Sequence, residues 1–393
     1  MEILMPMFRD EIETLEQNGI TRVALPRIDD PNVIALWFGE GDMVTPDFIR
    51  DAAKQALDEG YTFYSHTRGR QELRDAIKRY LDRIYGIDVN PERISVPGSS
   101  MLGINLAAQM TTGRGDHAVV VGPNWPNIIN CFQVAGAKID HVRKDFDGAN
   151  WSLDVSKIEA TLQSNTRAIF VNSPCNPTGW IMPEEEQQAL LDLCRARDVV
   201  LIADEVYHRN VFDTDVAPSF MSIARDDDPL IVVNGFSKAF AMTGWRLGWM
   251  VHPARSAQHL AVISECFNTG ATVFTQFAGI AALEHGDELV RELRARYAGG
   301  RELVMRYLGA HSRVEVSAPQ GAFYAFVRVP GMHSSLDFVQ GVLEECDVGL
   351  APGYTFGPGN DEYFRLCFAQ SHDRLEEALQ RICGYLDRHG NDL

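Results

Sequence analysis

Residues 117–251 alternate short apolar runs with segments of helical pattern, and this alternation constrains the fold more than any other feature of the sequence. The apolar runs are residues 118–121, 168–171, 199–203 and 230–233. Short runs of this kind, separated by helices, are typical of strands in a parallel sheet. We therefore expect an α/β fold in which helices cover a mostly parallel sheet on both faces.

Polar residues follow these runs at their carboxyl ends. Residues 172–179 follow the second run, residues 204–207 follow the third, and Ser237 and Lys238 come shortly after the fourth. In an open parallel sheet, ligands bind beyond the carboxyl ends of the strands. The sequence therefore predicts one ligand site that is assembled from these segments.

Lys238 and Arg246 lie in the stretch VNGFSKAFAMTGWRLG, residues 233–248. A lysine just beyond a buried strand can be desolvated, which lowers its pKa toward that of a nucleophilic amine. Arginine stays charged and binds phosphate or carboxylate with two parallel hydrogen bonds. Together they suit a phosphorylated aldehyde held as a Schiff base.

Small residues join the apolar residues 94–96 to a helix expected at 101–110. They are Gly98, Ser99 and Ser100. The free N–H groups and the dipole of a helix N-terminus favour an anion, so we interpret these residues as a phosphate cradle. An ordinary helix N-cap is the alternative.

Two charged residues stand next to or between apolar ones. Asp204 ends a strongly apolar run, and Arg365 lies within FRLCFA, residues 364–369. A buried charge is unfavourable without a partner of opposite sign. We therefore expect Asp204 to face a cation and Arg365 an anion, although an N-cap or a salt bridge is the alternative for Asp204.

The composition limits the classes of function. The chain has 393 residues, a net charge of −18 and 45% hydrophobic residues, which predicts a soluble protein of two domains and argues against nucleic acid as a partner. The seven cysteines include no CxxC pair, and this favours reduced thiols in the cytoplasm. We expect no metal site, no secretory signal, no membrane span, and no chemistry in residues 1–35.

The motifs around these residues resemble those of the pyridoxal-phosphate-dependent aminotransferases of the aspartate aminotransferase superfamily. The resemblance runs from about Trp37 to about Ala369 and includes N-P-T-G at 176–179 and D-E-V-Y at 204–207. It implies fold type I, with a mostly parallel seven-stranded sheet and a smaller α+β domain. The implied domains are residues 46–285 and 286–393, with residues 1–45 joining the smaller one.

The resemblance also implies how pyridoxal phosphate is held. Lys238 forms the Schiff base, and Asp204 pairs with the protonated pyridine nitrogen so that the ring withdraws electrons. Asn176 and Tyr207 bond the 3′ oxygen of the ring. The aromatic ring of Trp125 stacks on the pyridine, while Ser237 and Arg246 join the cradle around the phosphate.

The substrate contacts implied by the resemblance are fewer. Arg365 takes the α-carboxylate of the amino acid, Gly39 lets the substrate approach the backbone, and Trp125 and Asn176 adjoin it. The segment YSHTRGRQELR, residues 64–74, matches a pattern that places Tyr64 in the active site of the neighbouring subunit. This implies a homodimer with shared active sites.

The function implied is transamination, from an L-amino acid to a 2-oxo acid in a ping-pong reaction. A β-eliminating lyase or decarboxylase on the same fold is an alternative, and a silent cofactor-binding regulator is a second one. The substrate side chain stays open: Trp37, Phe38 and Trp125 suggest an apolar wall. Arg68 or Arg70 would have to read a side-chain carboxylate, and both are expected to be solvated surface charges.

One departure from the pattern concerns the phosphate. Many relatives carry a serine three residues before the Schiff-base lysine, whereas this chain has Gly235. We therefore expect weaker phosphate contacts from that side.

Overall fold

The computed structural model describes residues 7–389 of the chain. Residues 1–6, which begin the segment expected to carry no secretory signal, and residues 390–393 lie outside this range. No helix within the described range is both long enough and apolar enough to cross a membrane.

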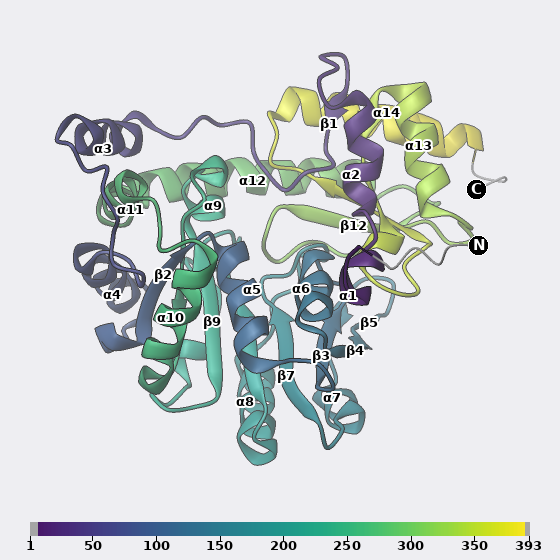
Figure 1. Cartoon of the computed structure of the whole chain (residues 1–393). Helices are drawn as coiled ribbons and strands as arrows, with labels where there is room; N and C mark the ends of the chain where they lie inside the picture. Colours follow the sequence, from purple (N-terminus) through teal and green to yellow (C-terminus); the bar gives the residue numbers. More distant parts are fainter. Residues whose placement is uncertain (1–6, 390–393) are drawn as a thin grey trace.

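A seven-stranded sheet forms the centre of the larger part (Figure 1). β10 is antiparallel to both of its neighbours, and the other neighbouring strands are parallel. The expected mostly parallel sheet is confirmed. In order across the sheet, the strands are β2 (Ile94–Gly98), β10 (Gly248–Val251), β9 (Leu230–Gly235), β8 (Val200–Asp204), β7 (Thr166–Asn172), β3 (His117–Gly122) and β4 (Lys138–Arg143).

Helices cover both faces of this sheet because successive strand residues point to opposite sides. In β3, for example, Ala118 and Val120 belong to one apolar cluster, whereas Val119 and Val121 belong to another. The first cluster includes residues of α5 (Ser100–Thr111), α6 (Asn127–Ala135) and α10 (Ala257–Phe267). The second includes residues of α3 (Asp47–Asp58), α4 (Gln71–Tyr85), α7 (Val155–Thr161), α8 (Glu184–Arg197) and α11 (Val273–His285).

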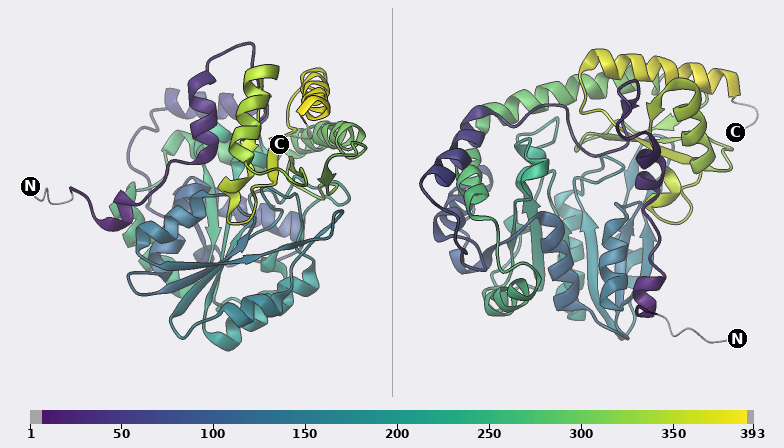
Figure 2. Two further views of the ribbon diagram at one scale, coloured as in Figure 1. Left: turned by 90° about the vertical axis from the view of Figure 1, so that its right-hand side faces the viewer. Right: turned by 45° about the horizontal axis from the view of Figure 1, so that its top comes forward.

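The smaller part is an α+β unit at the carboxyl-terminal end of the chain (Figure 1). Its antiparallel sheet has the order β11 (Glu315–Val316), β12 (Tyr324–Arg328), β15 (Tyr363–Cys367) and β14 (Ala351–Pro352). The helices α13 (Ser335–Cys346) and α14 (His372–His389) pack with it. The long helix α12 (Asp287–Tyr307) leads into this part and packs along α14 (Figure 2).

The amino-terminal segment also packs on the smaller part. β1 (Ile34–Ala35) pairs in parallel with β13 (Val348–Gly349), and α2 (Gly19–Ala24) contacts α13 and β14. In Figure 1 the purple helix α2 accordingly lies beside the yellow-green α13. The exact limits of the two domains stay a prediction.

Candidate functional site

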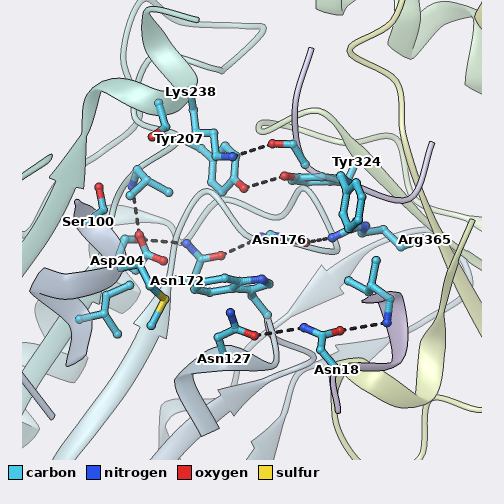
Figure 3. Close-up of a pocket in the computed structure, with 18 of the residues that line it drawn as sticks. Asn18, Ser100, Asn127, Asn172, Asn176, Asp204, Tyr207, Lys238, Tyr324 and Arg365 are labelled. Atoms are coloured by element: carbon cyan, nitrogen blue, oxygen red, sulfur yellow. Dashed lines mark hydrogen bonds between the residues drawn. The ribbon is translucent and has the colours of Figure 1, made fainter. Parts of the chain in front are cut away.

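A pocket of about 350 Å³ lies beyond the carboxyl ends of β7, β8 and β9 (Figure 3). Register aligns these strand ends, since Asn172 at the end of β7 pairs with Asp204 at the end of β8. The pocket is lined by residues predicted from the sequence and by residues that were not. The predicted ones are Gly39, Ser100, Trp125, Asn176, Asp204, Tyr207, Ser237, Lys238, Arg246 and Arg365.

Lys238 lies in the one-turn helix α9 (Phe236–Ala239), which begins where β9 ends. Its Nζ donates a 2.6 Å hydrogen bond to the carbonyl oxygen of Gly39, and Asn210 Nδ2 donates to the Lys238 carbonyl. Removal of the amine from water lowers its pKa to about 8. The neutral, nucleophilic amine is therefore far more populated near neutral pH than it is in an ordinary lysine, although the ammonium form still predominates.

Asp204 is buried at the end of β8, and its side chain is 5% exposed. Burial raises the pKa of this carboxyl to about 7, although the backbone N–H of Val206 and the positive charge of Lys238 oppose the shift. Within the described residues, Asp204 forms no salt bridge. A carboxylate in this position is stabilised when a ligand brings a cation to it.

Arg365 reaches the pocket from β15 of the smaller part. It is 1% exposed, and its Nη1 donates a 3.0 Å hydrogen bond to Asn176 Oδ1. Its Nη2 donates to the carbonyl oxygen of Trp37, while Nε has no hydrogen-bond partner in the described chain. No carboxylate pairs with this guanidinium in residues 7–389, so the pocket offers a cation to an anionic ligand.

Two tyrosines meet between Lys238 and Arg365 (Figure 3). The hydroxyls of Tyr207 and Tyr324 lie 2.7 Å apart, and burial raises the pKa of both phenols. A Cβ atom on Gly39 would lie 2.0 Å from the Tyr324 hydroxyl, so this position accepts glycine alone without rearrangement. The close approach that Gly39 was predicted to allow is therefore occupied by Tyr324 in this structure.

The predicted phosphate cradle surrounds the beginning of α5. Ser99 is the N-cap, with Oγ accepting from Leu102 N, so the alternative of a helix cap holds for this residue. Ser100 Oγ donates to the carbonyl oxygen of Asn234. Ser100, Ser237 and Arg246 line the pocket, whereas Gly98 and Ser99 are not among its lining residues.

The structure places three predicted residues elsewhere. Tyr64 is 92% exposed, outside the pocket of its own chain. Arg68 is buried and binds Glu92 and Ser95, so the expectation of a solvated charge was wrong for it. Arg70 packs against the rings of Tyr61 and Phe277 and pairs with Glu72, so it is not a freely solvated charge either.

Several residues that line the pocket were not predicted from the sequence. Asn18, Ile20 and Thr21 come from the amino-terminal segment, for which the sequence indicated no role in the site. Asn172 directly follows an apolar run, and that position could have predicted that it lines the site. Tyr324 lies among apolar residues of β12, with no comparable signal in its local sequence. The other residues that were not predicted are Met101, Ile104, Asn127 and Val206, whereas Trp37 and Phe38, which also line the pocket, were expected as an apolar wall.

Comparison with known proteins agrees with this geometry. The sequence profile described as "Aminotransferase class I and II" matches residues 33–382. The chain belongs to this family. It is 33% identical to an aspartate aminotransferase of Pyrococcus horikoshii over 89% of this chain and 90% of the relative. It is 32% identical to aromatic-amino-acid aminotransferase 2 of Thermococcus litoralis over 89% and 90%, respectively.

Solved structures extend the likeness to the fold. The crystal structure of Pyrococcus protein-A1 superposes with a TM-score of 0.92 at 31% identity, over 97% of this chain and 99% of that one. The structure of the alanine aminotransferase of Pyrococcus furiosus superposes with a TM-score of 0.90 at 27% identity, over 97% of this chain and 100% of that one. The chain is therefore a transaminase with the fold-type-I architecture expected from its motifs, and it catalyses amino-group transfer.

Proposed function

We propose that this transaminase uses pyridoxal 5′-phosphate to move the amino group of an L-amino acid to a 2-oxo acid in a ping-pong reaction, as part of amino acid metabolism. The observation that carries the proposal is that one pocket holds a lysine whose pKa is lowered by burial, a buried carboxyl group and a buried arginine: Lys238, Asp204 and Arg365. Class I and II aminotransferases use this cofactor.

The residues present fit the cofactor. Asp204 is a buried carboxylate without a cationic partner in the described chain, which suits a protonated ring nitrogen. The amine of Lys238 is available to an aldehyde carbon. Ser100 N–H at the beginning of α5, with Ser237 and Arg246, offers donors to a phosphate. When bound, pyridoxal phosphate supplies an aldehyde that condenses with amines and a ring that withdraws electrons from the substrate Cα.

The protein's own groups then orient the reactants and move protons. Tyr207 and Asn176 would hold the ring oxygen, and Trp125 would cover the ring face. Lys238, with its pKa near 8, would take the proton from the Cα of the substrate and donate it to the carbon that carried the aldehyde of the cofactor.

Arg365 would bind the α-carboxylate of the substrate. Its Nη1 and Nη2 already bond Asn176 and the Trp37 carbonyl, which fixes the plane of the guanidinium. A fork held in this way can bind a carboxylate through two hydrogen bonds with little further loss of side-chain freedom. Because every α-amino acid carries this group, Arg365 would serve all substrates alike.

We also propose a cytoplasmic homodimer with shared active sites. The exposure of Tyr64, at 92%, supports a role outside its own chain. Phe63, at 83%, and Val44, at 72%, are apolar side chains that a partner subunit would cover. All seven cysteines are free of disulfides, which suits a reducing compartment.

The test is a half-reaction with holoenzyme and one amino acid at a time, without a 2-oxo acid. We expect the absorbance of the bound cofactor to change to that of its amino form, with one 2-oxo acid released per site. A 2-oxo acid added afterwards should restore the first spectrum. Lys238→Ala should still bind cofactor but should not turn over, whereas release of ammonia or carbon dioxide in place of the half-reaction would contradict transamination.

A further inference from the structure

Two asparagine side chains meet at the end of the pocket farthest from Lys238 (Figure 3). Asn18 immediately precedes α2, and Asn127 is the first residue of α6. Asn18 Nδ2 donates a 3.1 Å hydrogen bond to Asn127 Oδ1. This contact joins the amino-terminal segment to the large sheet domain at the wall of the pocket.

The hydrogen bonds around Asn18 determine which way both amides face. Asn18 Oδ1 accepts the backbone N–H of Ile20 at 2.9 Å, as the N-cap of α2, and also faces the hydroxyl of Thr355 at 3.4 Å. Its Nδ2 therefore has to face Asn127, which must present its oxygen in return. The Nδ2 of Asn127 is left to the pocket and has no acceptor within residues 7–389.

The charges of the pocket are already assigned in the proposed function. The cations that line it within the described chain are Lys238, Arg246 and Arg365, and its acid is Asp204. The lining residues next to Asn18 and Asn127 in the sequence, Ile20, Thr21 and Trp125, carry no charge, and the apolar Ile20 donates its backbone N–H to Asn18. A substrate carboxylate at this end would find no cationic partner among the described residues of its own chain, and removing it from water without one is unfavourable.

An entirely apolar side chain suits this end no better. It would displace water from the Nδ2 of Asn127 and leave that donor without an acceptor. A neutral side chain that carries a hydrogen-bond acceptor avoids both penalties. Carboxamide and hydroxyl groups have this chemistry.

We propose that Asn127 determines substrate specificity by donating a hydrogen bond to a carboxamide or hydroxyl oxygen of the substrate side chain, and that Asn18 is the positioning residue that orients it. The inference rests on the proposed function and names the class of amino acid that the pocket prefers: neutral, with a hydrogen-bond acceptor in the side chain.

The test compares amino acids of nearly equal shape in half-reactions of the holoenzyme. One set is L-asparagine, L-leucine and L-aspartate; the other is L-glutamine, L-methionine and L-glutamate. In at least one set, the carboxamide should exceed both companions in kcat/KM by about tenfold or more. A preference for the acid or for the apolar member in both sets would overturn the inference.

Variants separate recognition from general damage. Asn127→Leu should reduce the ratio of carboxamide to apolar substrate about tenfold or more, while turnover of the apolar substrate persists. Asn130→Leu is the matched control on α6, since Asn130 does not line this pocket. In Asn130→Leu the ratio of carboxamide to apolar substrate should equal that of the wild type. An unchanged ratio in Asn127→Leu would overturn the assignment of Asn127 as the residue that determines specificity.

Asn18→Asp tests the positioning role. The carboxylate keeps an acceptor for the N–H of Ile20, so the cap of α2 remains, but the donor to Asn127 is lost. The carboxamide preference should fall, with KM changing more than kcat. If the holoenzyme turned over none of these amino acids, the proposed function itself would be overturned. If it turned them over without these preferences, only this inference would be overturned.

Discussion

A Cβ atom built on Gly235 would lie 2.1 Å from the hydroxyl oxygen of Ser100. The serine hydroxyl of α5 therefore fills the space that a side chain at position 235 would need. Ser100 Oγ also donates to the carbonyl oxygen of Asn234, which holds it there. This explains in steric terms why the chain carries glycine where many relatives carry serine.

We predict that Gly235→Ser lowers stability and cofactor affinity. Gly235 has a φ of −176°, which any residue adopts, so the effect arises from contacts of the added side chain, chiefly the overlap with Ser100 and less the Leu247 carbonyl oxygen at 3.3 Å. Overpacking of this kind destabilises by about 1–3 kcal/mol. The double variant Ser100→Ala/Gly235→Ser should recover most of the loss, because the overlapping oxygen is gone.

Thermal unfolding and equilibrium binding of pyridoxal phosphate measure both effects. Gly113→Ser is a suitable control, since the nearest atom to its added Cβ is 3.8 Å away. If the single Gly235→Ser variant were as stable as Gly113→Ser, or if Ser100→Ala gave no recovery, the steric explanation would be wrong.

The buried carboxyl of Asp204 should make stability depend on pH in the cofactor-free protein. Its pKa rises from 3.8 to about 7 on folding. Between these values the folded chain retains a proton that the unfolded chain has released. The free energy of unfolding therefore falls as pH rises from about 4 through about 7, by an amount on the order of a few kcal/mol.

Urea unfolding of wild type and of Asp204→Asn across this pH range isolates the contribution of Asp204 to the free energy of unfolding. Relative to wild type, the asparagine variant should become more stable as pH rises, because it lacks the titrating group. Glu205, whose pKa burial also raises to about 7, is present in both proteins, so it enters the difference only through the repulsion between its charge and that of Asp204. A difference in stability that stays constant with pH would refute the assignment.

The parts of the site that follow strands were predictable from the sequence. Asp204 and Lys238 stand at fixed places after apolar runs, and register in the sheet brings those places together. Asn18 and Tyr324 depend instead on how the amino-terminal segment and β12 pack against the large domain. That packing is a long-range property, and neither residue has a local pattern that reveals it.

Substitution of Arg365 should weaken the binding of every substrate by a similar factor. Arg365→Ala removes the cation for the common α-carboxylate, so KM should rise alike for amino acids with different side chains. Arg365→Lys keeps the charge but loses the fork, and we expect an intermediate rise. Removing one partner of a buried charged pair costs about 2 kcal/mol or more, which corresponds to about thirtyfold or more in kcat/KM.

Steady-state kinetics with apolar, polar and acidic amino acids check this prediction. Cofactor affinity, measured by absorbance, should change much less than KM in both variants. A loss confined to one class of substrate would show that Arg365 reads the side chain and not the α-carboxylate.

Tyr64 provides a test of the shared active site. Because its side chain is 92% exposed, Tyr64→Phe should leave the stability of the chain within about 0.5 kcal/mol of wild type but weaken cofactor binding in the dimer. Lys238→Ala chains mixed with Tyr64→Ala chains form hybrid dimers. If Tyr64 serves the partner's site, one site of each hybrid has both defects and the other has neither, so activity should exceed that of either parent. If Tyr64 acted within its own chain, each hybrid site would carry one defect, and mixing would restore nothing.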